Sequence, residues 1–109
     1  MRAYELAVIL DGDLEDHIAQ AWQKTITQAI KSNGGSVVGS PEWWGKRRLA
    51  YPIKKRNEGY YMFFNVVASG GAMDEVERTL RLADQVIRHK LLRLPDSEAE
   101  RRGMVAAAG

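Results

Sequence analysis

The sequence contains no cysteine. Disulfides, thiolate metal sites and cysteine nucleophiles are therefore excluded, and the absence fits a reducing compartment. The chain also lacks any run of about 18 apolar residues, which a membrane-spanning helix requires, and its start leads directly into a strand-like segment rather than a signal peptide. The 45% apolar content is enough to supply a core. Together these features predict a soluble cytoplasmic protein without membrane association.

Residue patterns that support catalysis are missing as well. No glycine-rich loop opens a helix, no serine lies beside a base in a recognisable pattern, and His17 and His89 fall on different predicted elements, unlike clustered metal ligands. The acylphosphatase fold shares the strand order predicted below, but it needs a phosphate-cradling arginine loop where this chain has the acidic turn 11–13. We therefore predict no enzymatic activity, cofactor, metal or small-molecule substrate.

Acidic residues are absent from the middle of the chain. Positions 46–57 hold six cations and no Asp or Glu, and Trp, Leu, Tyr and Ile are interleaved with the charges across residues 43–56. A solvated loop would not need these apolar residues and a buried strand would not tolerate six charges, whereas a strand at a sheet edge accommodates both. Residues 46–93 hold eleven Lys/Arg and five Asp/Glu, although the net charge of the chain is only +2. Random surface scatter is the alternative, but this segregation predicts an anionic partner on one side of the fold.

Hydrophobic periodicity and turn residues predict six elements in one domain. They are strand 3–10, a helix capped by Asp13 and ended by Asn33–Gly35, strand 36–44, strand 59–68 after a polar hairpin turn at 55–59, a helix over 73–80, and strand 86–94. The order strand, helix, strand, strand, helix, strand predicts an α+β, ferredoxin-like fold, with a four-stranded antiparallel sheet and both helices on one face. Residues 1–95 form the domain, and 96–109 are expected to be a flexible or partner-ordered tail.

Alternation along the strands assigns side chains to the two faces of this sheet. One set is predicted to face the helices: Leu6, Val8, Met62, Phe64, Val66, His89 and Leu91. The other is predicted to face outward: Glu5, Ile9, Tyr61, Phe63, Asn65, Arg88 and Lys90. Because the outward set mixes aromatic rings with cations, we predict a docking surface for RNA or protein.

Several segments along residues 1–94, in the same order, resemble the sixth protein of the bacterial small ribosomal subunit. The most specific is Trp44–Ile53 with the following Lys54-Lys55; the others are Tyr4-Glu5, Asn33–Gly35, Gly59–Tyr61 and Leu80–His89. The resemblance implies the ferredoxin-like fold and a structural role in the platform of the small subunit. It also implies binding to small-subunit ribosomal RNA together with small-subunit protein eighteen, as a heterodimer, with the C-terminal tail along that partner.

Ten residues are candidates for RNA contact. Arginine's planar fork and lysine's point charge suit phosphate, and such contacts position a protein on RNA and read its shape more than its sequence. The candidates are Arg2, Tyr4, Lys46, Arg47, Arg48, Lys54, Lys55, Arg56, Arg88 and Arg93. For a single cation the alternative is a solvated side chain, and for Tyr4 it is packing within this protein.

A second set of residues is expected at the interface with the protein partner: Trp44, Tyr51, Tyr61, Phe63 and Lys90. For Trp44 and Tyr51, the alternatives are stacking on bases and packing within this protein. Leu49 and Ile53 are expected to anchor the basic stretch on the domain. The alternative function is a protein-binding module of the same fold with little direct RNA contact, in which Tyr61 and Phe63 dominate.

Overall fold

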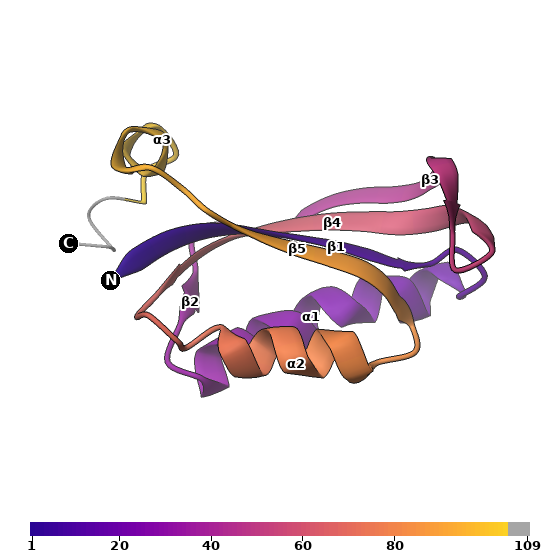
Figure 1. The fold of residues 1–109 in the computed structure, drawn as a ribbon, viewed down its shortest axis with the longest axis horizontal. Helices are drawn as coiled ribbons and strands as arrows, with labels where there is room; N and C mark the ends of the chain where they lie inside the picture. The colour runs from indigo at the N-terminus through magenta and orange to yellow at the C-terminus, as the bar shows by residue number, and fades with distance from the viewer. Residues whose placement is uncertain (105–109) are drawn as a thin grey trace.

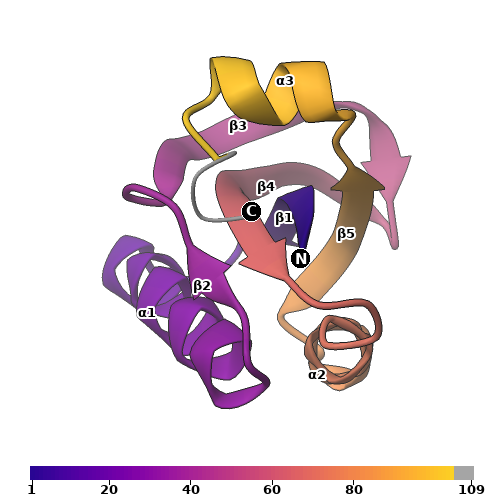
Figure 2. The same cartoon turned by 90° about the vertical axis from the view of Figure 1, so that its left-hand side faces the viewer.

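The computed structural model of this chain describes residues 1–104, which form a sheet with helices on both faces (Figure 1). The elements are β1 (Arg2–Asp11), α1 (Asp16–Ser32), β2 (Ser36–Val37), β3 (Glu42–Ile53), β4 (Arg56–Ala68), α2 (Asp74–Leu82), β5 (Val86–Arg93) and α3 (Asp96–Arg101). Helices α1 and α2 lie together under one face of the sheet, and α3 lies on the other side (Figure 2). The predicted α+β, ferredoxin-like arrangement is confirmed, with five strands instead of four.

Strand β1 lies at the centre of the sheet. Along one side it pairs antiparallel with β4 over its whole length, from Arg2 opposite Ala68 to Asp11 opposite Gly59. Along the other side it pairs antiparallel with β5, beginning with Tyr4 opposite Arg93. The near-continuous apolar run in β1 follows from cover on both of its faces. Leu6 and Val8 lie in the main core on the helix side, whereas on the other side Ala3 is buried with α3, and Ala7 and Ile9 face the end of β3.

The predicted alternation of the two sheet faces is confirmed. The helix-facing residues Leu6, Met62 and Phe64 are buried in the main core with Ile26 and Ile30 of α1. The outward face is more polar and is covered only at its two ends, by α3 and by β3. The sheet therefore leaves a partly open outward face on which docking can occur.

Helix α1 begins two residues later than the sequence predicted. Its first residue is Asp16 and its N-cap is Glu15. The expected cap, Asp13, instead turns its carboxylate to Arg56 at the start of β4, 3.1 Å away. Asp13 therefore forms an ion pair with a residue distant in the sequence instead of capping the helix, and local sequence patterns cannot predict such a pair.

The predicted strand 36–44 is wrong as a single element. Two short stretches pair with β4 instead, Ser36–Val37 and then β3 from Glu42, which lies opposite Phe63. Between them the chain leaves the ladder at Gly39, whose φ is +74°, and Pro41 has no N–H to donate. Because of this break, β3 is a separate strand from β2, and it continues beyond the part of β4 that pairs with β1.

The expected flexible tail from residue 96 differs from the structure over residues 96–104. These residues form helix α3 and a closing turn, in which Ala99 and Met104 are buried against Ala3 and Val67 on the outward face. Val105–Gly109 lie outside the described residues. Sequence periodicity could not predict this segment, because a six-residue helix is too short to repeat its apolar positions.

Arg102 holds this segment on the sheet. Its Nη1 donates to Glu5 Oε1 at 2.9 Å and to Asn65 Oδ1 at 3.1 Å, and its Nε donates to Glu98 at 3.2 Å. The hydrogen bond with Glu5 is the main effect that raises the pKa of Arg102 above its ordinary value, against the opposing effect of burial. The two polar residues of the outward face at this end are thus satisfied by the chain itself.

Met104→Ala is expected to destabilise the protein by about 2 kcal/mol or more, because a fully buried side chain leaves a cavity under α3. Urea unfolding followed by circular dichroism measures the change. Glu100→Ala on the exposed side of the same helix is the matched control and should change stability by less than about 0.5 kcal/mol. Equal midpoints for the two variants would show that α3 does not pack on the sheet in solution.

Candidate nucleic-acid interface

The basic stretch forms a hairpin arm that projects past the end of the sheet. We define the arm as β3, the turn after it and residues 56–58 of β4. Strand β4 is longer than its neighbour, because its pairing with β1 stops at Gly59 opposite Asp11. Residues 56–58 therefore have β3 on one side and, on the other, no strand but the loop after β1, where Gly12 packs against Glu58; the arm extends beyond the central ladder (Figure 1).

Two lysines occupy the tip of the arm. Ile53 pairs with Arg56, so the turn consists of Lys54 and Lys55 alone; it begins one residue before the predicted turn at 55–59 and is shorter. Both have positive φ, 49° and 65°. This is the backbone of a two-residue hairpin turn, which normally takes Asn-Gly because side chains with a Cβ are strained there. The sequence thus keeps two cations at a position where they cost stability.

Arg56 serves the arm rather than a partner. Its guanidinium bridges Asp11 Oδ2 and Asp13 Oδ2, each at 3.1 Å. A guanidinium held by two carboxylates has little net charge to offer a phosphate. The interpretation of Arg56 as a phosphate ligand is therefore not supported by its surroundings, and the residue instead fixes the base of the arm to the loop after β1.

The remaining cations of the arm are exposed along β3. Lys46 Nζ lies 5.5 Å from the centre of the Tyr60 ring, and the Arg47 guanidinium lies 5.0 Å from the centre of the Trp44 ring. Arg48 lies opposite Glu58 in the ladder. In the described part of the chain none of the three forms an ion pair shorter than 4.0 Å. Their charges are therefore available to an anion.

Three aromatic residues form a cluster on the outward face at the root of the arm. Trp44 lies over Tyr61 and Phe63, with ring centres 6.3 and 4.6 Å apart. It remains 45% exposed, and its indole N–H donates to Glu42 at 2.7 Å. These three predicted interface residues are thus brought together, and the cluster presents a fixed aromatic surface beside the cations.

Trp43 takes the opposite side of β3. It stacks on Tyr60 with ring centres 5.6 Å apart and packs against the main core. The ladder shifts register by one residue between Trp43 and Gly45, and Gly45 has a φ of +79°. This bulge turns the strand after the two tryptophans. Trp43 therefore anchors the arm while Trp44 stays available.

The end of β3 curves back over the outward face of the sheet, and we call its residues 49–53 the arch. Arg48 pairs with Glu58 and Ile53 pairs with Arg56, so residues 49–52 stand opposite the single residue Asn57. Leu49 is only 7% exposed and, with partly buried Ile53, lies over the outward face. The expectation that these two residues anchor the arm is confirmed.

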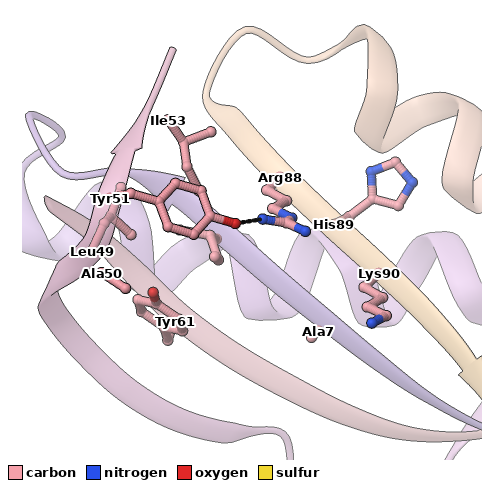
Figure 3. A pocket seen from close by; sticks show the side chains of 10 residues that line it. Ala7, Leu49, Ala50, Tyr51, Ile53, Tyr61, Arg88, His89 and Lys90 are labelled. Atoms are coloured by element: carbon pink, nitrogen blue, oxygen red, sulfur yellow. Dashed lines mark hydrogen bonds between the residues drawn. The ribbon is translucent and has the colours of Figure 1, made fainter. Parts of the chain in front are cut away.

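The middle of the arch is joined to β5 by a hydrogen bond across the outward face of the sheet. Tyr51, 58% exposed, accepts a hydrogen bond of 2.8 Å from Arg88 Nη1 on β5 (Figure 3). Lys90 lies two residues further along β5 and lines the same hollow. Arg88 and Lys90 thus lie on the outward face of the sheet and not near Lys54 and Lys55 at the tip of the arm.

Three candidate RNA residues lie at the opposite end of the sheet from the arm. Arg2 begins β1 and Arg93 ends β5, and both are exposed. Tyr4 pairs with Arg93 in the ladder, but its ring is 8% exposed and lies in the main core. Tyr4 is therefore excluded from base stacking, because its position in β1 has the parity of the helix-facing residues.

Within residues 1–104 no three of His, Asp and Glu are grouped as metal ligands. No helix of this part of the chain has the length and apolar character needed to cross a membrane.

Comparison with known proteins identifies the family. The family model described as "Ribosomal protein S6" matches residues 3–93. The small ribosomal subunit protein bS6 of Salinispora arenicola is 43% identical over 93 residues, which cover 85% of this chain and 96% of the relative. That of Caldanaerobacter subterraneus subsp. tengcongensis is 38% identical over 96 residues, which cover 88% and 100%.

A solved structure agrees with this assignment. The crystal structure of 30S ribosomal protein S6 from Thermotoga maritima superposes with a TM-score of 0.84 at 27% identity, over 94% of this chain and 95% of that chain. This chain therefore belongs to the ribosomal protein S6 family, whose members are structural components of the small subunit of the cytoplasmic ribosome and not enzymes.

Proposed function

We propose that this protein binds small-subunit ribosomal RNA in the platform, together with small-subunit protein eighteen. The observation that carries the RNA half is the tip of the arm, where Lys54 and Lys55 are kept in a backbone conformation that favours glycine and asparagine. Strained residues persist where the surrounding structure and function hold them in place. Two lysines at the end of a projecting hairpin are well placed to reach the phosphates of a folded RNA.

The cations of the arm form the main RNA-contacting set in this proposal: Lys46, Arg47, Arg48, Lys54 and Lys55. Arg2 and Arg93, at the other end of the sheet, provide a separate contact. Two contacts at opposite ends of an elongated domain, whose longest dimension is 41 Å, fix its orientation on the RNA. Contacts of this kind read the shape of the RNA backbone more than its sequence.

The outward face supplies the protein half of the proposal. The aromatic cluster of Trp44, Tyr61 and Phe63 and the arch with Tyr51 form one continuous surface, bordered by Lys90. Aromatic side chains in a fixed position favour a protein interface, since they bury large area at little entropic cost. We infer that protein eighteen docks on this face while the arm reaches RNA.

A second candidate function is a protein-binding module with little direct RNA contact. Its support is Arg56, a cation of the basic stretch that is committed to Asp11 and Asp13. If the other cations likewise only support the arm, their loss will weaken binding of the protein partner and leave RNA binding unchanged. The salt dependence of RNA binding separates the two functions.

Combined substitution of Arg47, Arg48, Lys54 and Lys55 by Ala should flatten the salt dependence of RNA binding. Each phosphate contact contributes roughly 0.7–0.9 to the slope of log K against log salt, so four lost contacts lower the slope by about 3. Filter binding of a platform RNA fragment, in the presence of protein eighteen and at several salt concentrations, measures this slope.

A matched control removes four cations from the helix layer: Lys24, Lys31, Arg78 and Arg81, all exposed. It changes net charge equally, but it should alter the slope by less than about 1, because these residues lie on the other side of the sheet. Equal slopes for the two quadruple variants, or an unchanged slope for the first, would favour the protein-binding module.

Lys54→Asn combined with Lys55→Gly should separate stability from RNA binding. The pair Asn-Gly suits positive φ at both positions, so the free energy of unfolding should rise by about 1 kcal/mol. RNA affinity should fall nevertheless, with a slope lower by about 2. Thermal unfolding and RNA binding measure the two effects, and the Lys54→Arg, Lys55→Arg variant keeps both charges as the control. A more stable variant with undiminished RNA affinity would remove the tip from the RNA site.

A further inference from the structure

A small pocket lies on the outward face, under the arch of β3 (Figure 3). Its floor and inner wall are formed by Ala7 and Ile9 of β1 and by Leu49 and Ile53 of the arch, all of them apolar. Its volume is about 190 Å³. Pockets for small molecules usually measure on the order of 300–1,000 Å³, so this pocket suits a single side chain better than a metabolite.

The pocket is held open from two sides. Leu49 is buried and fixes the start of the arch on the sheet. The hydrogen bond from Arg88 to the Tyr51 hydroxyl ties the middle of the arch to β5, across the central strand. Preformed pockets of this kind favour binding, because the protein loses little conformational entropy when the ligand enters.

The rim of the pocket is positively charged. Arg88 and Lys90 line it, and no Asp or Glu is among the lining residues. Among residues 1–104 neither cation forms an ion pair, and the hydrogen bond to Tyr51 occupies only one of the five N–H donors of Arg88. The rim is therefore complementary to an anionic group beside an apolar one.

We propose that this pocket is the socket for an apolar side chain of the protein partner, and that a carboxylate next to this side chain pairs with Arg88 and Lys90. The inference deepens the protein half of the proposed function and rests on it. A nucleobase is the weaker fit, because its ring edges carry donors and acceptors that would lose water against Ile9, Leu49 and Ile53. A buried apolar anchor with a charged rim is the usual composition of an interface hot spot.

Two substitutions close the socket while leaving the arm's cations in place. Ala7→Leu fills the floor, and Ala50→Glu, at an exposed position of the arch, places a competing carboxylate at the rim. Each should weaken binding of protein eighteen, measured by titration calorimetry, by roughly tenfold or more. Ala21→Leu on the exposed side of α1 is the matched control and should bind normally. Circular dichroism confirms folding, and Ala50→Glu carries the test if Ala7→Leu does not fold.

A second pair of variants tests whether a carboxylate of the protein partner pairs with Arg88. Arg88→Gln removes the charge and should reduce the salt dependence of binding to protein eighteen, because rim charges act through electrostatic attraction. Tyr51→Phe removes the same hydrogen bond to the arch but keeps the charge, so it should leave that salt dependence unchanged. Equal effects of the two variants would show that Arg88 only supports the arch, and would overturn the pairing with a carboxylate.

The outcomes distinguish the socket from the wider function. Normal binding of protein eighteen by both Ala7→Leu and Ala50→Glu overturns the socket, whereas the proposed heterodimer stands. A loss confined to RNA binding overturns it in favour of a nucleobase, and a change confined to self-association overturns it in favour of a second copy of the chain. No binding of protein eighteen by the unaltered chain overturns both the heterodimer and the socket.

Discussion

The arm depends on a mismatch in length between two paired strands. Strand β4 has 13 residues and β1 has 10, and the excess of β4 lies entirely at its start. Residues 56–58 must leave the sheet with β3, because no third strand continues beside them. An arm built in this way inherits the rigidity of the central ladder. The ion pairs of Arg56 with Asp11 and Asp13 then brace it at the point where the ladder ends.

Charge counts and charge availability differ along this arm. The sequence does not distinguish the six cations between 46 and 57. In the structure they differ in which groups surround each charge. Arg56 is neutralised by carboxylates, Arg47 lies over Trp44, and Lys54 and Lys55 are held at the tip. The same distinction applies to the outward face, where Arg102 satisfies Glu5 and Asn65 at one end, while at the other end Arg88 and Lys90 form no ion pair within residues 1–104.

Local sequence pattern predicted the parts of this fold that repeat along the chain. Alternation in β1 and β4 was enough to divide the sheet into its two faces, because a strand of ten residues offers several consistent positions. The pattern failed where one contact decided the outcome. Asp13 was expected to cap a helix, Tyr4 to face a ligand and residues 96–104 to be free, and each is instead fixed by a partner distant in the sequence. The pocket under the arch was equally invisible, since its walls come from β1, β3, β4 and β5.

The central position of β1 has a consequence for how the protein is made. Strand β1 is synthesised before its partners β4 and β5, so Tyr4 reaches its final neighbours only after Val66 and Arg93 have been synthesised. At roughly 5–20 residues per second, the apolar run of β1 waits for several seconds without its sheet. The sheet can therefore close only late in synthesis, and until then the apolar run of β1 stays without the strands that cover its edges.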